Sequence, residues 1–303
     1  MKHFVGPLTI ALLAAPPTIS FSQTRSIGIN IQKIEEITGT KGTVNSEERV
    51  FKVSFPRTDA KVTIDGWPMN PFLGLTSWAA FRKGGEKESI VMGDLVLFED
   101  EVNPVMSVAL ENGLDVTALH NHFFYDNPRV YFMHISGDGS LETFAKAVRK
   151  TQDKIKEIRA RMPAPVKGFP GPTIPPESSI DGPAIEKALG ATGQSTSGMF
   201  KVVIGRKTTM PCGCDVGKEM GVNTWAAFAG SNENALVDGD FAVLESELQA
   251  VLRALRAADI NIVAIHHHMI QEQPRFVFLH YWGKGPVTQL AEGLRSALSK
   301  TAE

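Results

Sequence analysis

The chain has 303 residues, of which 43% are hydrophobic and 21% charged, and its formal net charge is −2. This length fits two domains of ordinary size, and the composition supports a folded core rather than a disordered chain. A near-neutral charge without a long basic run argues against a nucleic-acid-binding protein, which needs a positive surface. A count of two cysteines excludes a disulfide scaffold and a four-cysteine zinc site.

The first 22 residues have the pattern of a secretory signal peptide. Residues 4–21 carry no charge, contain an apolar run over 8–15, and lead to small side chains at Ser20 and Ser22. A membrane anchor is the weaker interpretation, because three prolines interrupt the apolar segment. No later segment approaches ~20 apolar residues. We therefore expect a periplasmic or secreted protein, with no membrane span after signal cleavage.

The rest of the chain contains one unit twice. Residues 91–136 align with residues 237–282 without a gap and share 13 identical residues in 46 positions. Seven prolines over residues 161–183 are typical of an extended linker. We expect the signal peptide over 1–22, a first repeat over 23–160, a linker over 161–182 and a second repeat over 183–303.

The elements expected in each repeat follow one plan. A short helix comes first, over about 29–38 and 182–189, and ends at Gly39 or Gly190. Strands follow around 50–55, 61–65, 76–82 and 90–97 in the first repeat, then a helix, two strands and a last helix.

Two capping signals mark the middle helices. Asp100 is the expected cap in the first repeat, and Ser246 to Gln249 read as a capping box in the second. The mixture of elements predicts an α+β fold, with two homologous repeats in a pseudo-twofold arrangement. Each repeat is expected to have an antiparallel sheet and flanking helices.

Six of the eight histidines have the same spacing in both repeats. They are His120, His122 and His134, and, 146 residues later, His266, His268 and His280. A strand places residues two apart on one face, and a hairpin centred near Asn127 would set His120 opposite His134 and His122 opposite Phe132. Three imidazoles then share one face, which matches the ligands of a catalytic zinc site with an open position for water.

We therefore predict a divalent metal ion, with zinc as the expected metal, at one triad, at both, or at a composite of the two; iron, nickel or copper would accept the same ligands. The alternative is a buried histidine network with a packing or proton-relay role. His267 and Asn121 alternate away from the triads and are expected to be core or second-layer polar residues.

Four carboxylates are candidate catalytic bases. They are Asp94 and Asp240, in or near strands, and Glu99 and Glu245, just before the middle helices. For the glutamates, complementation of the helix dipole is the favoured alternative. For the aspartates, a functional and a structural role weigh equally, because a carboxylate in a strand needs a partner.

Arg129 and Arg275 follow the turn prolines and are candidate binding residues for an anionic substrate, although pairing with Asp126 or Glu272 explains them as well. Cys212 and Cys214 have no counterpart in the first repeat. Export favours their oxidation, whereas their spacing would strain a disulfide, and two thiolates alone make a weak soft-metal site.

Several segments resemble the bacterial LppY/LpqO family of exported proteins, a family of unknown function. They include VFKVSFPRTD, NPFLGLTSWAAF, VMGDLVLFEDEVNPVMSVALENGLDVTALHNHFFYDNPRVYFMH, GVNTWAAFAGS and INIVAIHHHMIQEQPRFVFLHYWG. The resemblance covers essentially the whole mature chain and implies an envelope location and a duplicated domain, but no activity. Some family members are lipoproteins. This chain lacks the lipid-accepting cysteine, which implies a soluble form, and its Cys-Gly-Cys element differs from the usual family sequence.

Three functions fit these observations. The first is a metal-dependent hydrolase acting on a small-molecule or cell-envelope substrate, such as a phosphoester, a cell-wall amide or a lactone. The second is a non-enzymatic periplasmic metal or small-ligand carrier. The third is a structural or interaction domain whose histidines belong to the core. The oligomeric state is left open.

Overall fold

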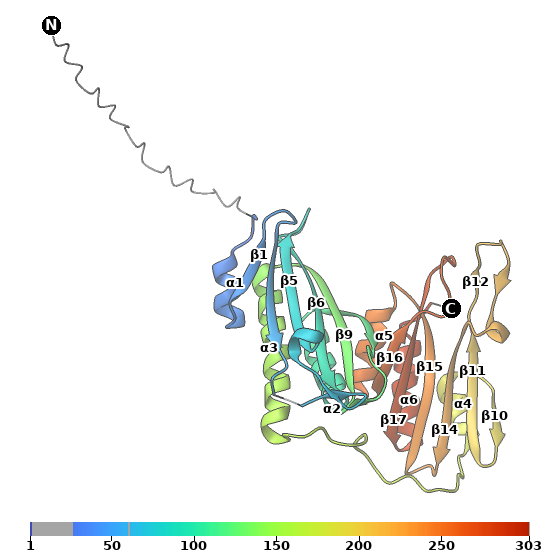
Figure 1. Cartoon of the computed structure of the whole chain (residues 1–303). Coiled ribbons are helices and arrows are strands. Elements are labelled where there is room, and N and C mark those ends of the chain that lie inside the picture. Colours follow the sequence, from blue (N-terminus) through green and yellow to red (C-terminus); the bar gives the residue numbers. More distant parts are fainter. Residues whose placement is uncertain (2–26, 60, 303) are drawn as a thin grey trace.

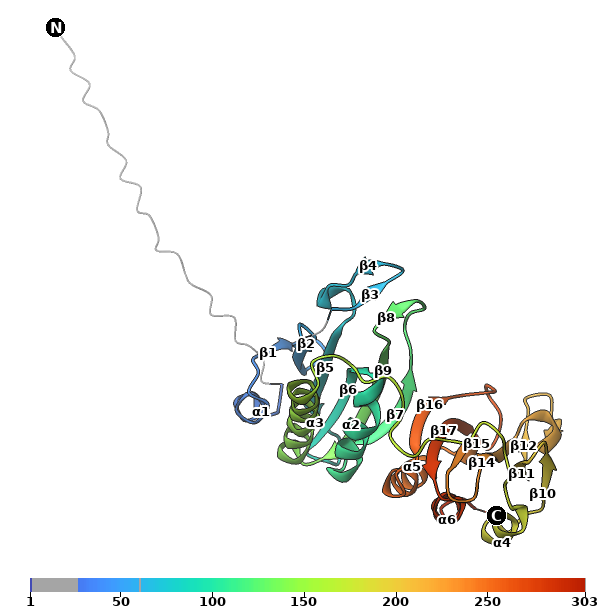
Figure 2. The same ribbon diagram turned by 90° about the horizontal axis from the view of Figure 1, so that it is seen from below.

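The computed structural model describes residues 27–59 and 61–302, together with Met1. The remainder of the expected signal peptide lies outside the described residues. The fold is α+β, with helices packed on one face of a large antiparallel sheet (Figures 1 and 2). No helix within the described part of the chain is long and apolar enough to cross a membrane.

The first repeat supplies the elements from α1 to α3. In chain order they are α1 (Ile31–Thr38), β1 (Gly42–Asn45), β2 (Val50–Pro56), β3 (Thr63–Ile64), β4 (Trp67–Pro68), the 3-10 turn η1 (Pro71–Leu73), β5 (Thr76–Lys83), β6 (Ser89–Phe98), α2 (Glu99–Glu111), β7 (Asp115–His120), β8 (Asp126–Asn127), β9 (Val130–Gly139) and α3 (Leu141–Arg161).

The second repeat follows the same order. Its elements are α4 (Gly182–Leu189), β10 (Gly193–Thr196), β11 (Met199–Gly205), β12 (Thr208–Thr209), β13 (Asp215–Val216), η2 (Lys218–Met220), β14 (Asn223–Gly230), β15 (Ala235–Leu244), α5 (Leu248–Ala257), β16 (Asn261–His266), β17 (Phe276–Gly285) and α6 (Val287–Leu298). Helices α1 and α4 end at Gly39 and Gly190, both left-handed, as predicted.

Twelve strands form one continuous sheet across both repeats. Their order is β1-β2-β5-β6-β9-β7-β16-β17-β15-β14-β11-β10, which reads as the same pattern from either edge. The repeats join where β7 pairs antiparallel with β16, through Leu119 and Ile265. The pseudo-twofold axis therefore passes between these two central strands.

Two side-chain amides reinforce this junction reciprocally. Asn103 on α2 donates to the carbonyl oxygen of Ile262 at 3.1 Å and accepts from its N–H at 2.7 Å. Gln249 on α5 makes the matching pair with Val116, at 2.9 and 3.0 Å. Both β7 and β16 have a register shift beside these residues. Each middle helix therefore supplies side-chain hydrogen bonds to the backbone of the irregular strand in the other repeat.

The two faces of the sheet have different environments. The helix-covered face buries the main core, including Leu119, Met133, Ile265 and Leu279. Alternate residues of the same strands point to the opposite side, which we call the open face. Smaller apolar clusters around Phe132 and Phe278 cover one end of the open face in each repeat.

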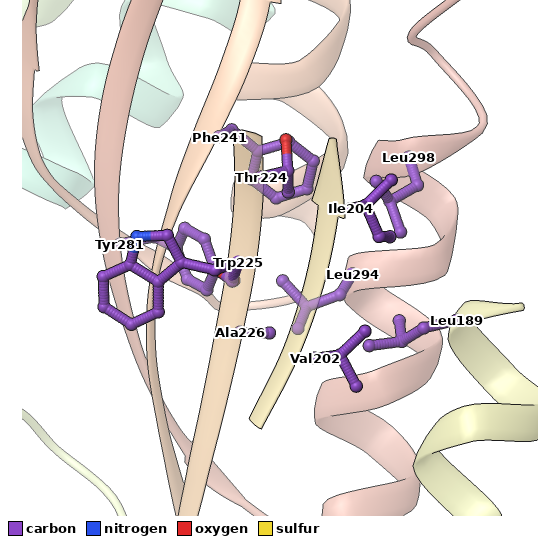
Figure 3. Close-up of a pocket in the computed structure, with 10 residues that line it drawn as sticks. All are labelled: Leu189, Val202, Ile204, Thr224, Trp225, Ala226, Phe241, Tyr281, Leu294 and Leu298. Carbon is purple, nitrogen blue, oxygen red and sulfur yellow. The ribbon is translucent and has the colours of Figure 1, made fainter. Parts of the chain in front are cut away.

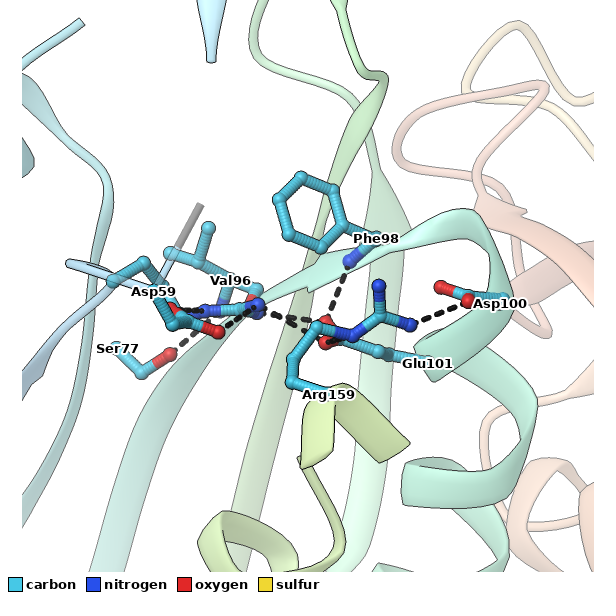
Figure 4. A network of polar contacts seen from close by, with 8 residues as sticks. Asp59, Ser77, Val96, Phe98, Asp100, Glu101 and Arg159 are labelled. Atoms are coloured by element: carbon cyan, nitrogen blue, oxygen red, sulfur yellow. Dashed lines mark hydrogen bonds and ion pairs between the residues drawn. The ribbon is translucent and has the colours of Figure 1, made fainter. Parts of the chain in front are cut away.

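A buried ion cluster fixes the end of β6 against α2 (Figure 4). Arg57 donates to Glu101 at 2.7 and 3.0 Å, and Glu101 also accepts the N–H of Phe98. Arg159, near the end of α3, pairs with Glu101 at 2.9 Å and with Asp100. Asp100 is therefore an ion-pair partner and lies inside the first turn of α2, so its prediction as the cap was wrong.

An equivalent ion pair with fewer partners lies at the corresponding position of the second repeat. Arg206 donates to Glu247 at 2.6 Å, and Glu247 accepts the N–H of Leu244. The predicted capping box from Ser246 does not form, because Glu247 occupies the N-cap position of α5 and Gln249 points to the other repeat.

Candidate metal centre

The second-repeat histidines converge on the open face. His266 ends β16, His280 lies on β17, and His268 follows two residues after β16. The ring centroid of His266 lies 5.1 Å from those of His268 and His280. One ring nitrogen from each residue lies within 4.8 Å of the other two. Such a group of three could hold a metal ion, whose identity the ligand set leaves open.

The pairing register differs from the prediction by two residues. His134 pairs with Ala118, and His120 pairs with Phe132, whereas His120 was expected opposite His134. The connection between the strands is longer than a tight hairpin and contains β8, which pairs with β3 instead. The histidines still converge, because a shift of two residues keeps every side chain on its original face.

The first-repeat triad has nearly the same ring arrangement. His120 lies 5.1 Å from His122 and from His134, centroid to centroid. His122 stacks on Phe132 at 3.3 Å, as His268 stacks on Phe278 at 3.6 Å. Within the described residues, however, only the second triad has its three nitrogens within 4.8 Å. The second repeat is therefore the better organised metal site as it stands.

A buried carboxylate flanks the second triad. Asp240 pairs across the strands with His280 and is 3% exposed, and its Oδ2 lies 3.6 Å from His268 Nε2. Its Oδ1 is buried and has no hydrogen-bond partner in the described part of the chain. Burial raises the pKa of Asp240 to about 7, against the opposing effect of His280.

The first repeat places Asp94 in the same position. Asp94 pairs with His134, is 8% exposed, and also leaves a buried Oδ1 without a hydrogen-bond partner among the described residues. Burial raises its pKa despite three nearby histidines. A buried carboxylate oxygen without a partner is costly, and the same oxygen in both repeats is suited to accept a hydrogen bond or to bind a cation.

Three of the histidines are shifted toward the neutral form, which is the form that binds a metal ion. Burial, followed by the neighbouring imidazoles, lowers the pKa of His122, His266 and His268. A lowered pKa favours the neutral ring, whose free nitrogen lone pair is the metal ligand.

The candidate glutamates lie elsewhere. Glu99 is exposed in the first turn of α2, where it complements the helix dipole. Glu245 is exposed and forms an ion pair of 3.5 Å with Arg275. In the described residues neither glutamate has an ion pair or hydrogen bond with a histidine, so the aspartates are the carboxylates at the site.

The candidate arginines have exposed side chains. Arg275 pairs with Glu245 rather than with Glu272, which instead accepts the N–H of Phe276. Arg129 has no ion pair in the part of the chain that the structure describes, and Asp126 accepts the N–H of Val130.

Two polar residues beside the triads support the local backbone. His267 Nδ1 lies 3.0 Å from the carbonyl oxygen of Phe276, and Asn121 donates to the carbonyl of Phe123 at 2.8 Å. Cys212 and Cys214 are joined by a disulfide, so neither thiolate is free for a soft metal.

A lysine and a tryptophan in each repeat also lie on this face, and neither was predicted as a site residue from the sequence. Lys52 lies 4.2 Å above the ring of Trp78, and Lys201 lies 4.2 Å above that of Trp225. The repeated GLTSWAAF and GVNTWAAF segments contain the two tryptophans and were the available signal.

A small apolar cavity lies apart from the histidines, beneath α6 (Figure 3). It is lined by Leu189, Val202, Ile204, Thr224, Trp225, Ala226, Phe241, Tyr281, Leu294 and Leu298. With no histidine or carboxylate in that lining, the cavity is not the candidate metal centre.

The fold and the site together define a duplicated α+β protein with a repeated histidine–aspartate cluster on one sheet. The chain belongs to the family described as Domain of Unknown Function (DUF1259), whose model matches residues 32–154 and 183–300. The two matches agree with the internal duplication. No curated protein matches the chain.

One solved structure is similar in outline, a trimeric bacterial microcompartment shell protein, PduB. The sequence identity is 9%, over 86% of this chain and 89% of that chain, with a TM-score of 0.23. A score of that size carries no conclusion about fold, assembly or function.

Proposed function

We propose that this protein is an exported, divalent-metal-dependent hydrolase of the cell envelope, with zinc as the expected metal. The observation that carries the proposal is the convergence of His266, His268 and His280 beside the buried, unsatisfied Asp240. The first-repeat triad with Asp94 is the proposed second centre. The signal-peptide pattern and the resemblance to the LppY/LpqO family support a periplasmic or secreted location.

His266, His268 and His280 would hold a zinc ion through their ring nitrogens. The ion would supply a more acidic water, which is a nucleophile near neutral pH. Asp240, whose Oδ2 lies 3.6 Å from His268 Nε2, and Asp94, which pairs across the strands with His134, are the proposed groups that orient a ligand histidine or take up a proton. His268 is exposed and His266 and His280 are half-buried, so a phosphoester, ester or amide substrate could approach the site from solvent.

The second candidate is a periplasmic carrier of metal or small ligands without turnover. The apolar cavity of Figure 3 contains none of the histidines, which favours a surface site over an enclosed substrate pocket. A carrier would bind the same ions through the same side chains.

Turnover assays separate the two functions. Protein without a histidine tag is stripped of metal, reloaded with zinc, and tested on generic phosphoester, ester and amide substrates. The hydrolase predicts zinc-dependent turnover that His266→Ala combined with His268→Ala reduces by about a hundredfold or more. Tight zinc binding without turnover on any of these substrate classes would favour the carrier.

A further inference from the structure

A row of equivalent side chains crosses the open face from one repeat to the other. Its members, in order across the strands, are Lys52, Trp78, Asp94, His134, His120, His266, His280, Asp240, Trp225 and Lys201. In each repeat the tryptophan pairs directly with the aspartate, and the aspartate with a histidine. Directly paired residues point to the same face of a sheet.

The row continues across the junction of the repeats. Leu119 pairs with Ile265 and both are buried under the helices, so the following residues, His120 and His266, point to the open face. On adjacent antiparallel strands these two histidines are diagonal neighbours, about 7–8 Å apart.

The two histidine clusters therefore lie close together. In the first repeat, the cluster spans β9 and β7, and in the second it spans β16 and β17. Their centres are separated by two strand spacings, about 10 Å. The floor between them is formed by Ala118 and Ala264, which alternate onto the open face and have only methyl side chains.

Charge at the loaded face favours an anion. A divalent ion held by neutral imidazoles and one carboxylate retains positive charge. Lys52 and Lys201 add a cation at each end of the row. Asp238, two residues from Asp240, adds a negative charge to the same face, and Phe169 of the linker stacks on Trp282 nearby. The acid groups of an anionic ligand are therefore expected to bind the metal ions rather than this part of the face.

Resting on the proposed function, we infer that both metal centres bind one ligand at the same time, an anionic molecule with two acid groups about 10 Å apart. Each acid group coordinates one metal ion, and the backbone of the ligand lies over Ala118 and Ala264. A diacid, or an oligomer with regularly spaced acid groups, has this chemistry. A substrate with a single acid group would use only half of the face.

Calorimetric titration of the zinc-loaded, tag-free chain with simple acids tests this inference. The probes are suberate, whose two carboxylates are separated by a six-carbon spacer, the shorter diacid succinate, and the monoacid octanoate. Suberate should bind at least about tenfold more tightly than octanoate, because its second carboxylate binds at a high effective concentration. Succinate, which is too short to reach both centres, should show no such gain.

Removing one centre should abolish the advantage. In His120→Ala combined with His134→Ala, suberate should bind only as tightly as octanoate, whereas Thr117→Ala on the same strand should leave the ratio unchanged. Equal affinities of suberate and octanoate for a chain that holds zinc at both triads would overturn the inference and leave the proposed function standing. Absence of zinc from either triad, measured on the same samples, would overturn the inference at its premise.

Discussion

At the scale of single residues, the account depends on buried carboxylates beside histidines. Asp240 and Asp94 each keep one oxygen without a hydrogen-bond partner in the described residues, although both lie in a sheet interior that normally satisfies its polar atoms. A cation bound at this point would satisfy the same oxygen in both repeats.

Asp240→Asn tests this explanation with little change of shape. The variant should lose about 10- to 100-fold in zinc affinity at the second triad, because the amide neither orients nor neutralises the site as a carboxylate does. Competition against a chelating dye measures the affinity. Asp238→Asn, on the same strand, is the matched control and should change it by less than about twofold. Unchanged zinc binding in Asp240→Asn would remove the aspartate from the site.

A second residue-scale prediction concerns Arg206 and Glu247. Burial alone would raise the pKa of Glu247, but hydrogen bonds from Arg206 and from two backbone N–H groups outweigh it and hold the pKa below its usual value. Arg206→Met should lower the free energy of unfolding by about 2–4 kcal/mol at pH 7, since it leaves a buried carboxylate unpaired.

The pH dependence of that loss has a definite sign. A depressed pKa stabilises the folded state above the unfolded value, about 4.3 for glutamate, and the stabilisation is lost as the pH falls through the folded value. Urea unfolding should therefore show a smaller difference between Arg206→Met and the parent chain at acid pH than at pH 7. A difference that stayed constant down to the acid limit would show that the ion pair is not its source.

At the scale of elements, the sequence predicted where helices end more accurately than which strand residues pair. Glycine stops placed the ends of α1 and α4 at Gly39 and Gly190. The hairpin register was wrong because, in both repeats, the chain between the paired strands pairs with a distant segment, β8 with β3 in the first and Gln273 with Thr209 in the second. Such long-range pairing has no local signature.

The capping signals failed for a related reason. Asp100 and Gln249 have side chains suited to helix starts, but the tertiary structure supplies better partners, Arg159 for one and Val116 for the other. The histidine clusters were predictable because period-two alternation fixes a face whatever the register. The alignment of the two clusters across the repeats was not predictable, because it depends on the pairing of β7 with β16.

The reciprocal amides give an element-scale prediction. Asn103 is 5% exposed and satisfies both backbone groups of Ile262. Asn103→Ala should lower the free energy of unfolding by about 1–3 kcal/mol, because the N–H and the carbonyl of Ile262 remain buried without partners. Denaturant titration measures the loss. Asn112→Ala, a more exposed position at the end of the same helix, is the control, and an equal loss in both variants would argue against the junction role.

At the scale of the whole molecule, the two repeats form one folding unit rather than two independent domains. Their main core is continuous, and the sheet passes through β7 and β16 without interruption (Figure 2). The family model matches each repeat separately, so the duplication is visible in the sequence, whereas the shared sheet is a property of the pair.

Cutting the linker tests this unity. A protease site inserted within residues 167–173 should be cleaved without separating the halves, because the strand junction and the reciprocal amides hold them together. Size-exclusion chromatography of the cut protein should give one peak at the mass of the intact chain. Separate peaks for the two repeats would show that the junction is too weak to join them.

The central claim is that the histidine clusters bind metal, and zinc stoichiometry tests it most directly. Equilibrium dialysis of the tag-free chain, followed by elemental analysis, should find about two zinc ions per chain, one for each triad. The number should fall to about one after His266→Ala combined with His280→Ala, and to none when His120→Ala and His134→Ala are added. If the parent chain retains no more zinc than this fourfold variant, the histidines are a structural network and the account is contradicted.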